Sequence, residues 1–445
     1  NDFPVYGGIS DPDFHVRGYL VEYDVPDTTP PAKPFVTDTG QFTSSASVLS
    51  ASWSSTDPES GIVEYQYAIG TSPAGPGSGY IIGWKSAGTS TQVTETGLSL
   101  QDGVTYYWYV KARNGSGLWS AVGVSDGITV DLTAPDTSIT GGPANSSLSR
   151  NADATFTFAG TDNLTSSSAL RFQWRLDNAE WSAASTETTA HLTNIVDGVH
   201  TFQVRAVDLA GNADATPASV TWRVMAGSLP VEASGAGRAK LQADGVELLL
   251  TGCVVTAAPG QAAAGRAYVE SLDRSAGLAI LTDLALMEGQ VIEAVGRMST
   301  NVDGERVLTQ PFIRVIGQTQ PLEPVWLTLA NAAGGPFFHS LATGAGQRGV
   351  TDPAGRSLNT TGLLVRVSGW VSEIDSNFIY INEGSLPVVR GVRVSRLNAP
   401  STVRVNDFVT VTGISSMRRA GLSYQLVIRP RSSADFQVVT HADEP

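Results

Sequence analysis

The sequence is poor in cysteine, in charged residues and in long apolar runs, and each shortage excludes a class of protein. The single cysteine, Cys253, rules out an internal disulfide framework and a zinc site built from several thiolates. No apolar run reaches the roughly 18 residues of a membrane helix, so we expect no membrane insertion. A net charge of −14 disfavours nucleic acid and anionic lipid as partners.

Charged residues make up only 16% of the chain, and Ser, Thr and Gly take their place. Apolar residues alternate with polar ones in short bursts between Gly, Pro, Asn and Asp. Tyr106–Ala112, Thr201–Ala206 and Phe408–Thr412 are rich in β-branched and aromatic residues, a composition that favours strands. Only Leu327–Ala333 is typical of a helical turn, since two glycines follow it. The pattern predicts an all-β protein.

Proline-containing joints divide the chain. Asp27–Pro31 and Asp131–Pro135 are both Asp/Thr/Pro segments, and they bracket about 100 residues, the size of one sandwich. A Gly/Ser/Ala-rich joint follows at 226–237, and another break at 321–324. We therefore expect an N-terminal remnant strand and linker (1–27), two sandwiches (28–131 and 132–226), a barrel (227–320), and a second barrel with a Gly-rich loop at its start (321–445).

The two early units repeat one another. Gly103–Ala112 aligns with Gly198–Ala206, and each strand follows an Asp-Gly turn and ends near Asn or Asp. These motifs, with Val204–Asp214 (VRAVDLAGNAD), resemble fibronectin type III and related bacterial immunoglobulin-like modules over about residues 28–225. The resemblance implies a secreted bacterial protein built of sandwiches, with Trp53 in the first core. It identifies a fold and no activity.

A second repeat relates the last two units. Leu248–Gly252 matches Leu364–Gly369, and Val291–Gly296 matches Phe408–Gly413 with the same spacing between the glycines. Five strands in about 90 residues, with glycines inside strands where a barrel bends, predict an OB-like β-barrel. The pair is similar to tandem OB-like modules found near the ends of large secreted bacterial proteins. The expected fold class is thus an all-β, multidomain chain of two sandwiches and two OB-like barrels.

The first residues suggest a lectin. Asn1-Asp2-Phe3 and Gly18–Tyr23 resemble the closing strands of a C-type lectin-like domain, a family in which the Asn and Asp bind calcium. The resemblance makes Asn1 and Asp2 candidate metal ligands, although two residues cannot fill the six to eight positions around calcium.

Two further polar turns have calcium and purely structural interpretations. Asp208, Asn212 and Asp214 follow a strand and offer oxygen ligands, but Asx turns explain the same residues. Asp57–Gly61 has the same two interpretations. Calcium is therefore the one candidate cofactor.

We expect no enzymatic activity. The sequence has no G-x-S-x-G elbow, and its five histidines lack metal-binding spacing. Four tryptophans either stack on sugars or fill cores and seams: Trp84, Trp119, Trp181 and Trp370. Four N-x-S/T sequons are glycosylation candidates: Asn114, Asn145, Asn163 and Asn359.

The charge is distributed unevenly. Residues 1–226 carry 10 basic and 23 acidic side chains, whereas residues 227–445 carry 18 and 19. Eight arginines and no lysine lie between 390 and 431: Arg390, Arg393, Arg396, Arg404, Arg418, Arg419, Arg429 and Arg431. Three interpretations stay open. The arginines are solvated, or they bind single-stranded nucleic acid or an anionic glycan, or they contact the acidic half of another copy in a head-to-tail filament.

We predict a non-enzymatic extracellular structural protein, a cell-surface or filament-forming subunit or adhesin with an arginine-rich interface. Its partners would be other copies of itself or cell-surface proteins, and not nucleic acid. The alternative is a carbohydrate-binding accessory region of a secreted lectin or glycoside-active protein, with glycans as partners.

Overall fold

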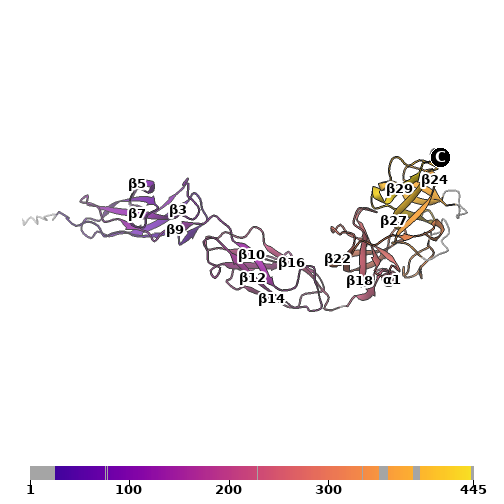
Figure 1. Ribbon diagram of the computed structural model, residues 1–445. Coiled ribbons are helices and arrows are strands. Elements are labelled where there is room, and N and C mark those ends of the chain that lie inside the picture. The colour runs from indigo at the N-terminus through magenta and orange to yellow at the C-terminus, as the bar shows by residue number, and fades with distance from the viewer. Residues whose placement is uncertain are drawn as a thin grey trace, which may run out of the picture.

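The computed structural model describes residues 26–441 except 76, 78, 228, 333, 350–358 and 384–390. These residues are mainly β-strand, with two short α-helices, α1 (Ala236–Lys240) and α2 (Leu329–Ala332). Figure 1 shows two sandwiches end to end, followed by two barrels. The predictions of an all-β chain and of a helical turn near residue 330 are confirmed. Neither helix has the length and apolar character that a membrane crossing demands.

The first sandwich packs two layers whose strands are antiparallel except for the parallel β2–β9 pair. One layer has the order β1-β3-β6 and the other β2-β9-β7-β4-β5, with β8 on β7. Trp53, which is 4% exposed, contacts Tyr67 between the layers, and Tyr67 contacts Trp108. The expected core position of Trp53 is confirmed. The strands are β1 (Phe35–Asp38), β2 (Phe42–Thr43), β3 (Leu49–Ser54), β4 (Ile62–Gly70), β5 (Tyr80–Gly88), β6 (Gln92–Glu95), β7 (Thr105–Asn114), β8 (Gly123–Val124) and β9 (Ile128–Val130).

The second sandwich has the same plan with sheets β10-β12-β14 and β11-β16-β15-β13. Along β12, buried and exposed residues alternate, because successive side chains of a strand point to opposite faces. Phe156 stacks on Phe202 in the core, and Trp222 packs edge-on against Phe156. The strands are β10 (Asp136–Gly141), β11 (Leu148–Ser149), β12 (Ala154–Thr161), β13 (Arg171–Leu176), β14 (Thr189–Leu192), β15 (Gly198–Val207) and β16 (Ala218–Val224).

Each C-terminal unit closes five strands into a ring. In the first barrel β18 pairs with β19 and β21, and the ring runs β18-β19-β20-β22-β21 with a parallel β20–β22 pair. The strands are β17 (Val231–Ser234), β18 (Glu247–Ala257), β19 (Arg266–Ser271), β20 (Gly277–Leu281), β21 (Gln290–Thr300) and β22 (Arg306–Gln318). Cys253 is a fully buried core residue of β18, as expected.

The second barrel repeats this ring as β24-β25-β26-β28-β27, with β26 and β28 parallel. Its strands are β23 (Val325–Trp326), β24 (Leu364–Ile374), β25 (Phe378–Asn382), β26 (Val392–Ser395), β27 (Phe408–Ala420), β28 (Ser423–Arg429) and β29 (Phe436–Thr440). The prediction of two barrels is confirmed. The finer prediction, that they belong with tandem OB-like modules, stays a prediction.

The repeated glycines mark the same place in both rings. Gly296 faces Leu248, as Gly413 faces Val365. A Cβ at Gly413 would lie 2.6 Å from the carbonyl oxygen of Arg429, because the neighbouring strand passes directly over this position. Close approach of the backbone therefore explains why a residue without a side chain is needed.

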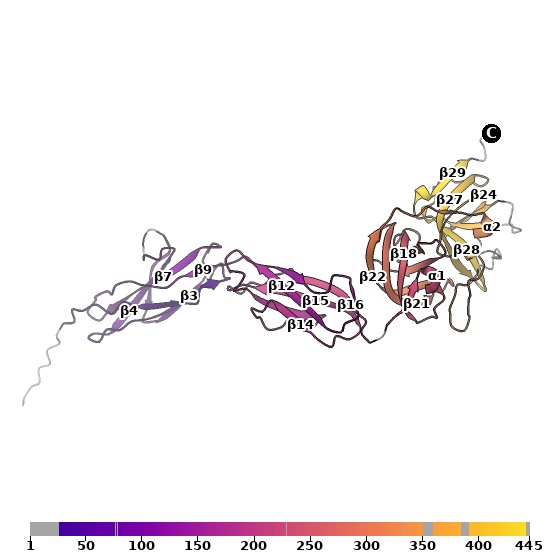
Figure 2. The ribbon, with the colours of Figure 1, turned by 60° about the horizontal axis from the view of Figure 1, so that its bottom comes forward.

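The two barrels share a buried seam and lie side by side (Figures 1 and 2). Tyr268 of the first barrel packs in one apolar cluster with Leu364 and Ile414 of the second. Lys240 is 2% exposed and donates to the carbonyl of Thr361 at 2.6 Å. Polar bonds cross the seam as well, because Arg431 pairs with Glu288 at 2.5 Å and Glu270 accepts from the amide of Leu364.

The sandwich joints are held by specific bonds. Asp102, at the end of the first sandwich, accepts the amide of Leu132 at 2.7 Å and the hydroxyl of Thr133 at 2.9 Å. Asp197 takes the same role in the second sandwich by accepting the amide of Ala226. A salt bridge between Arg223 and Glu247 then joins this sandwich to the first barrel.

Candidate functional site

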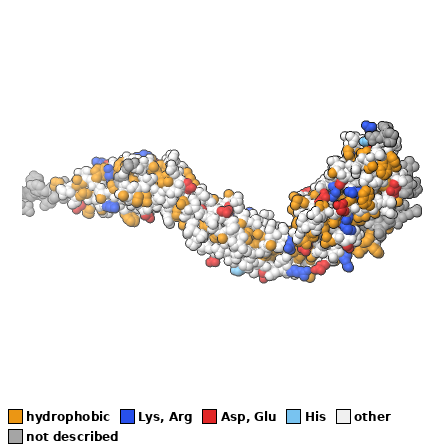
Figure 3. All heavy atoms as spheres, viewed as in Figure 1, with side chains coloured by type: hydrophobic (Ala, Val, Ile, Leu, Met, Phe, Trp, Pro, Cys, Tyr) orange, Lys and Arg blue, Asp and Glu red, His pale blue; other side chains and the backbone are white. Residues whose placement is uncertain are grey.

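Three predicted site residues, Asn1, Asp2 and Arg390, lie outside the described residues. Two groups among the others stand out. Acidic residues gather at the N-terminal edge of each sandwich, and arginines line a groove on the second barrel (Figure 3 shows one face of the molecule with its charged side chains).

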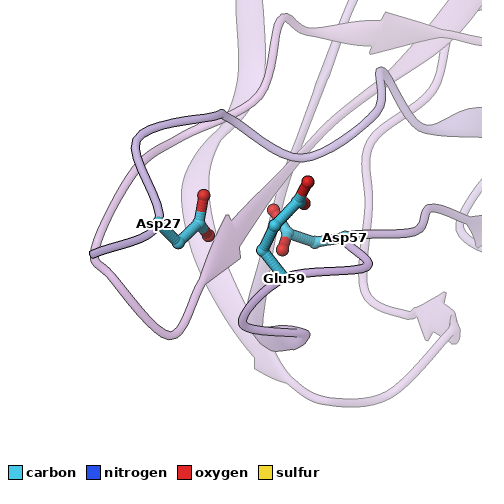
Figure 4. A group of neighbouring side chains, drawn as sticks. All are labelled: Asp27, Asp57 and Glu59. Atoms are coloured by element: carbon cyan, nitrogen blue, oxygen red, sulfur yellow. The ribbon is translucent and has the colours of Figure 1, made fainter. Parts of the chain in front are cut away.

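The first acid cluster joins the linker to a loop of the first sandwich. A carboxylate oxygen of each of Asp27, Asp57 and Glu59 lies within 4.8 Å of the others, and Figure 4 shows the three side chains on neighbouring loops. Asn114, at the end of β7, is fully buried beside them. Its Nδ2 donates to Asp27 Oδ2 at 2.6 Å and to Asp57 Oδ2 at 3.1 Å. Hydrogen bonds, the strongest from Ser60, hold the pKa of Asp27 below its usual value.

The second acid cluster lies at the joint between the two sandwiches. It brings together Asp131 from the linker, Asp162 from the loop after β12 and Asp208 from the end of β15, again within 4.8 Å. Asp131 is 0% exposed and Asp208 4% exposed. Burial, and then repulsion from the other two acids, raises the pKa of Asp131 to about 6.

The predicted triad of Asp208, Asn212 and Asp214 does not converge as a set. Asn212 Nδ2 donates to Asp208 Oδ2 at 2.7 Å and to the carbonyl of Asp131 at 2.8 Å. Asp214 accepts the amide and the hydroxyl of Thr216, as in an Asx turn. Of the three, Asp208 alone belongs to the acid cluster.

Sequence reasoning missed Asp131 and Asp162. Both residues are in segments that look like ordinary linker and turn, and the fold brings them to Asp208 from distant parts of the chain. The sequence did hold a signal for Asp131. This residue begins the second Asp/Thr/Pro joint, as Asp27 begins the first.

Three of the predicted arginines line one groove on the second barrel. Arg396, Arg418 and Arg429 surround a hollow of about 600 Å³ that also contacts Phe378 and Asp303. Arg418 lies 5.0 Å from the ring centre of Phe378. Arg396 donates to the carbonyl of Asp375, and Arg429 donates to Ser416. The groove is therefore positively charged, with its arginines oriented by bonds within the chain.

The remaining arginines are dispersed. Arg431 is bound by Asp435 and Glu288 in the seam between the barrels. Arg393 is 7% exposed and packs against the ring of Tyr380. Arg419 is exposed beside the groove, where its backbone amide donates to Asp303. Arg404 is also exposed.

Three of the four candidate tryptophans are engaged by cations. The amine of Lys111 lies 4.5 Å from the ring centre of Trp84 and 4.4 Å from that of Trp119. Trp181 is likewise contacted by two arginines, each at 4.4 Å. Each of these rings therefore packs against basic side chains of its own sandwich. Trp370 differs, because 53% of it is exposed.

The sequons also differ in accessibility. Asn114 is 0% exposed, and its amide nitrogen is used in the first acid cluster, so the folded chain cannot present it for glycosylation. This candidate is corrected. Asn145 and Asn163 are exposed, and Asn359 is half-buried with its amide bonded to the carbonyl of Gly335.

Several solved structures resemble parts of this chain. The fibronectin(III)-like modules of Clostridium thermocellum CbhA match with 19% identity and a TM-score of 0.30, covering 43% of this chain and 94% of theirs. The FN1-FN3 domains of chicken CNTN1 match with 19% identity and a TM-score of 0.25, covering 43% and 69%. A titin module from human cardiac muscle matches with 23% identity and a TM-score of 0.16, covering 22% and 88%.

No family model matches the chain, and neither does any curated protein. The fibronectin III or immunoglobulin-like fold of the two sandwiches is therefore defined by their own strand order, in which a three-stranded sheet faces a larger one.

Proposed function

We propose that this chain is a non-enzymatic structural segment of an extracellular or cell-surface protein, in which two sandwiches form an arm that carries a two-barrel head. The observation that supports this proposal is the construction of the joints. Asp102 binds the linker from the first sandwich, and Asn212 binds it from the second. Such bonds resist bending at a joint that proline already stiffens.

The charge distribution favours self-assembly as the role of this arm. The groove of Arg396, Arg418 and Arg429 offers planar, bidentate donors to carboxylates. The acidic excess lies at the other end of the chain, in residues 1–226. A contact between the groove of one copy and the acidic sandwiches of the next is heterologous, and it builds a filament when the rotation does not close.

Charge reversal tests this assembly. Arg418→Glu with Arg419→Glu replaces two exposed cations at the groove, so the variant should shift to monomers at concentrations where the native chain assembles. Arg238→Glu is the matched control, since Arg238 is an arginine of α1 that lies outside the groove. Analytical ultracentrifugation in low salt measures both. Equal assembly of the double variant and the control would refute the groove as the contact.

A carbohydrate-binding role is the second candidate, and the aromatic surface of the second barrel supports it. Trp370 is 53% exposed and packs edge-on against Phe408, with ring centres 5.0 Å apart. Trp326 is 63% exposed on the adjoining strand, with Arg366 over its ring. A glycan-array screen of the native chain and Trp370→Ala would test this surface. Binding that Trp370→Ala abolishes would favour the glycan role over assembly.

A further inference from the structure

The two acid clusters occupy equivalent places in the two sandwiches. The amide of Asn114 donates to the carbonyl of Leu118 at 3.1 Å, and that of Asp208 to the carbonyl of Asn212 at 3.0 Å. The side chains repeat the pattern, because Oδ1 of Asn114 accepts the amide of Leu118 at 2.8 Å and Oδ1 of Asp208 accepts that of Asn212 at 2.7 Å. Asn114 and Asp208 therefore hold the same position.

The other members correspond in the same way. Asp27 Oδ1 accepts the amide of the threonine two residues on, and so does Asp131 Oδ1. Asp57 and Asp162 each accept the backbone amide of the third residue after them, at 2.9 and 2.7 Å. The clusters thus differ at two positions. Asn114 stands where the second cluster has Asp208, and the exposed Glu59 stands where the second sandwich has Leu164.

The difference between Asn114 and Asp208 decides how the negative charge is balanced. In the first cluster the amide nitrogen of Asn114 lies between Asp27 and Asp57 and donates to both. Each of these carboxylates therefore has a donor inside the protein. Asp27 and Asp57 are therefore satisfied within the protein, and Glu59, the third acid of this cluster, is exposed to solvent.

In the second cluster Asp208 supplies a third carboxylate where the first has a donor. Asp131 Oδ2 and Asp162 Oδ1 are buried atoms with no hydrogen-bond donor among the residues described. Asp131 is wholly buried, and its carboxyl group lies beside two further carboxylates. The side-chain nitrogen of Asn212 donates to Asp208 Oδ2 and to the backbone carbonyl of Asp131, and so to neither of these two unpartnered oxygens. Buried, unpaired carboxylates are costly unless a cation compensates them.

We propose that Asp131, Asp162 and Asp208 bind one Ca²⁺ at the joint between the sandwiches, and that the equivalent cluster around Asn114 binds none. Carboxylate oxygens are the ligands that Ca²⁺ prefers, and water completes its six to eight positions. Asp131 directly follows β9 and its amide is bonded to the carbonyl of Thr43 in the first sandwich. The ion therefore ties the end of one sandwich to two loops of the next. The site is independent of the assembly proposed above.

Isothermal titration of CaCl2 into the full chain, after EDTA treatment and dialysis, tests the site. The native chain should bind one ion. Asp208→Asn should weaken binding at least about 100-fold, because it removes one of three carboxylates and introduces the amide of the first cluster. The matched control is Asp57→Asn, which should bind as the native chain does.

Absence of saturable binding, or equal affinity in Asp208→Asn, would overturn the site, and two ions per native chain would overturn the difference between the clusters. Circular dichroism establishes that Asp208→Asn is folded. If that variant does not fold, calorimetry of the native chain decides. CaCl2 should then raise the midpoint of one unfolding transition over its value in EDTA, and an unchanged midpoint would overturn the proposal.

Discussion

Replacing Asp131 by asparagine should stabilise the second sandwich when divalent cations are absent. The fully buried carboxyl of Asp131 faces Asp162 and Asp208, with Asp102 also nearby, and its pKa is raised from 3.8 to about 6. The folded chain thus holds this proton more tightly than the unfolded chain. The ionised carboxylate therefore lowers the free energy of unfolding at high pH, and this penalty disappears as the pH falls below about 4.

The magnitude follows from the raised pKa. At about 1.4 kcal/mol for each tenfold change in acidity, the penalty at pH 8 is about 3 kcal/mol. The amide introduced by Asp131→Asn would keep the oxygen that accepts from Thr133 and would add a donor toward the remaining acids, as Asn114 does in the first cluster. For a sandwich of about 90 residues, a gain of this size raises the midpoint by roughly 12–24 °C.

Differential scanning calorimetry of the full chain in EDTA, at pH 8 and pH 4, is the assay. We expect one transition to move upward in Asp131→Asn at pH 8, with little change at pH 4. In CaCl2 the order should reverse, since the variant lacks a ligand. A lower midpoint for Asp131→Asn in EDTA at pH 8, or an equal gain at both pH values, would show that the reasoning about the cluster is wrong.

Two further predictions concern the barrels. Burial lowers the pKa of Lys240 to about 7 despite the nearby Glu305, so the free energy of unfolding of the barrel pair should rise between pH 7 and about 10, where the unfolded chain still holds the proton. Urea unfolding across this range should show the slope, and Lys240→Met should remove it. Gly413→Ala should cost about 1–3 kcal/mol, because the added Cβ would meet the backbone of Arg429, whereas Gly83→Ala, in open space, should cost less than about 0.5 kcal/mol. Equal shifts of the urea midpoint from its native value in these two glycine variants would contradict the close-approach argument.

Local pattern was sufficient to predict much of the fold. Alternation and β-branched composition predicted strands, and the matched spacing of Gly296 and Gly413 predicted two copies of one barrel. Closure of the second barrel was not predictable in the same way. The chain has one strand more than the ring needs: β28 closes the ring, and β29 adds an outer strand on β27. The pairing of each strand across the barrel decides which of the two belongs to the ring.

The candidate sites were less predictable, because they depend on contacts between distant segments. The arginines are close in sequence, but the fold separates them. Arg393 on β26 is buried, Arg431 after β28 lies in the barrel seam, and Arg418 on β27 lies at the groove. The acid cluster at the joint combines a linker with two loops. Asn114 and Asp208 hold equivalent positions in the two clusters. This equivalence is recognised only when each residue is seen with its hydrogen-bond partners.

Negative-stain electron microscopy of the natively isolated protein tests whether this chain is a stiff arm that assembles with further copies of itself. We expect particles with an arm of two sandwiches held in line with each other and joined to a two-barrel head, and these particles should form regular filaments in low salt. Isolated particles whose sandwiches bend freely at residues 131–135, without ordered assemblies, would contradict the structural role.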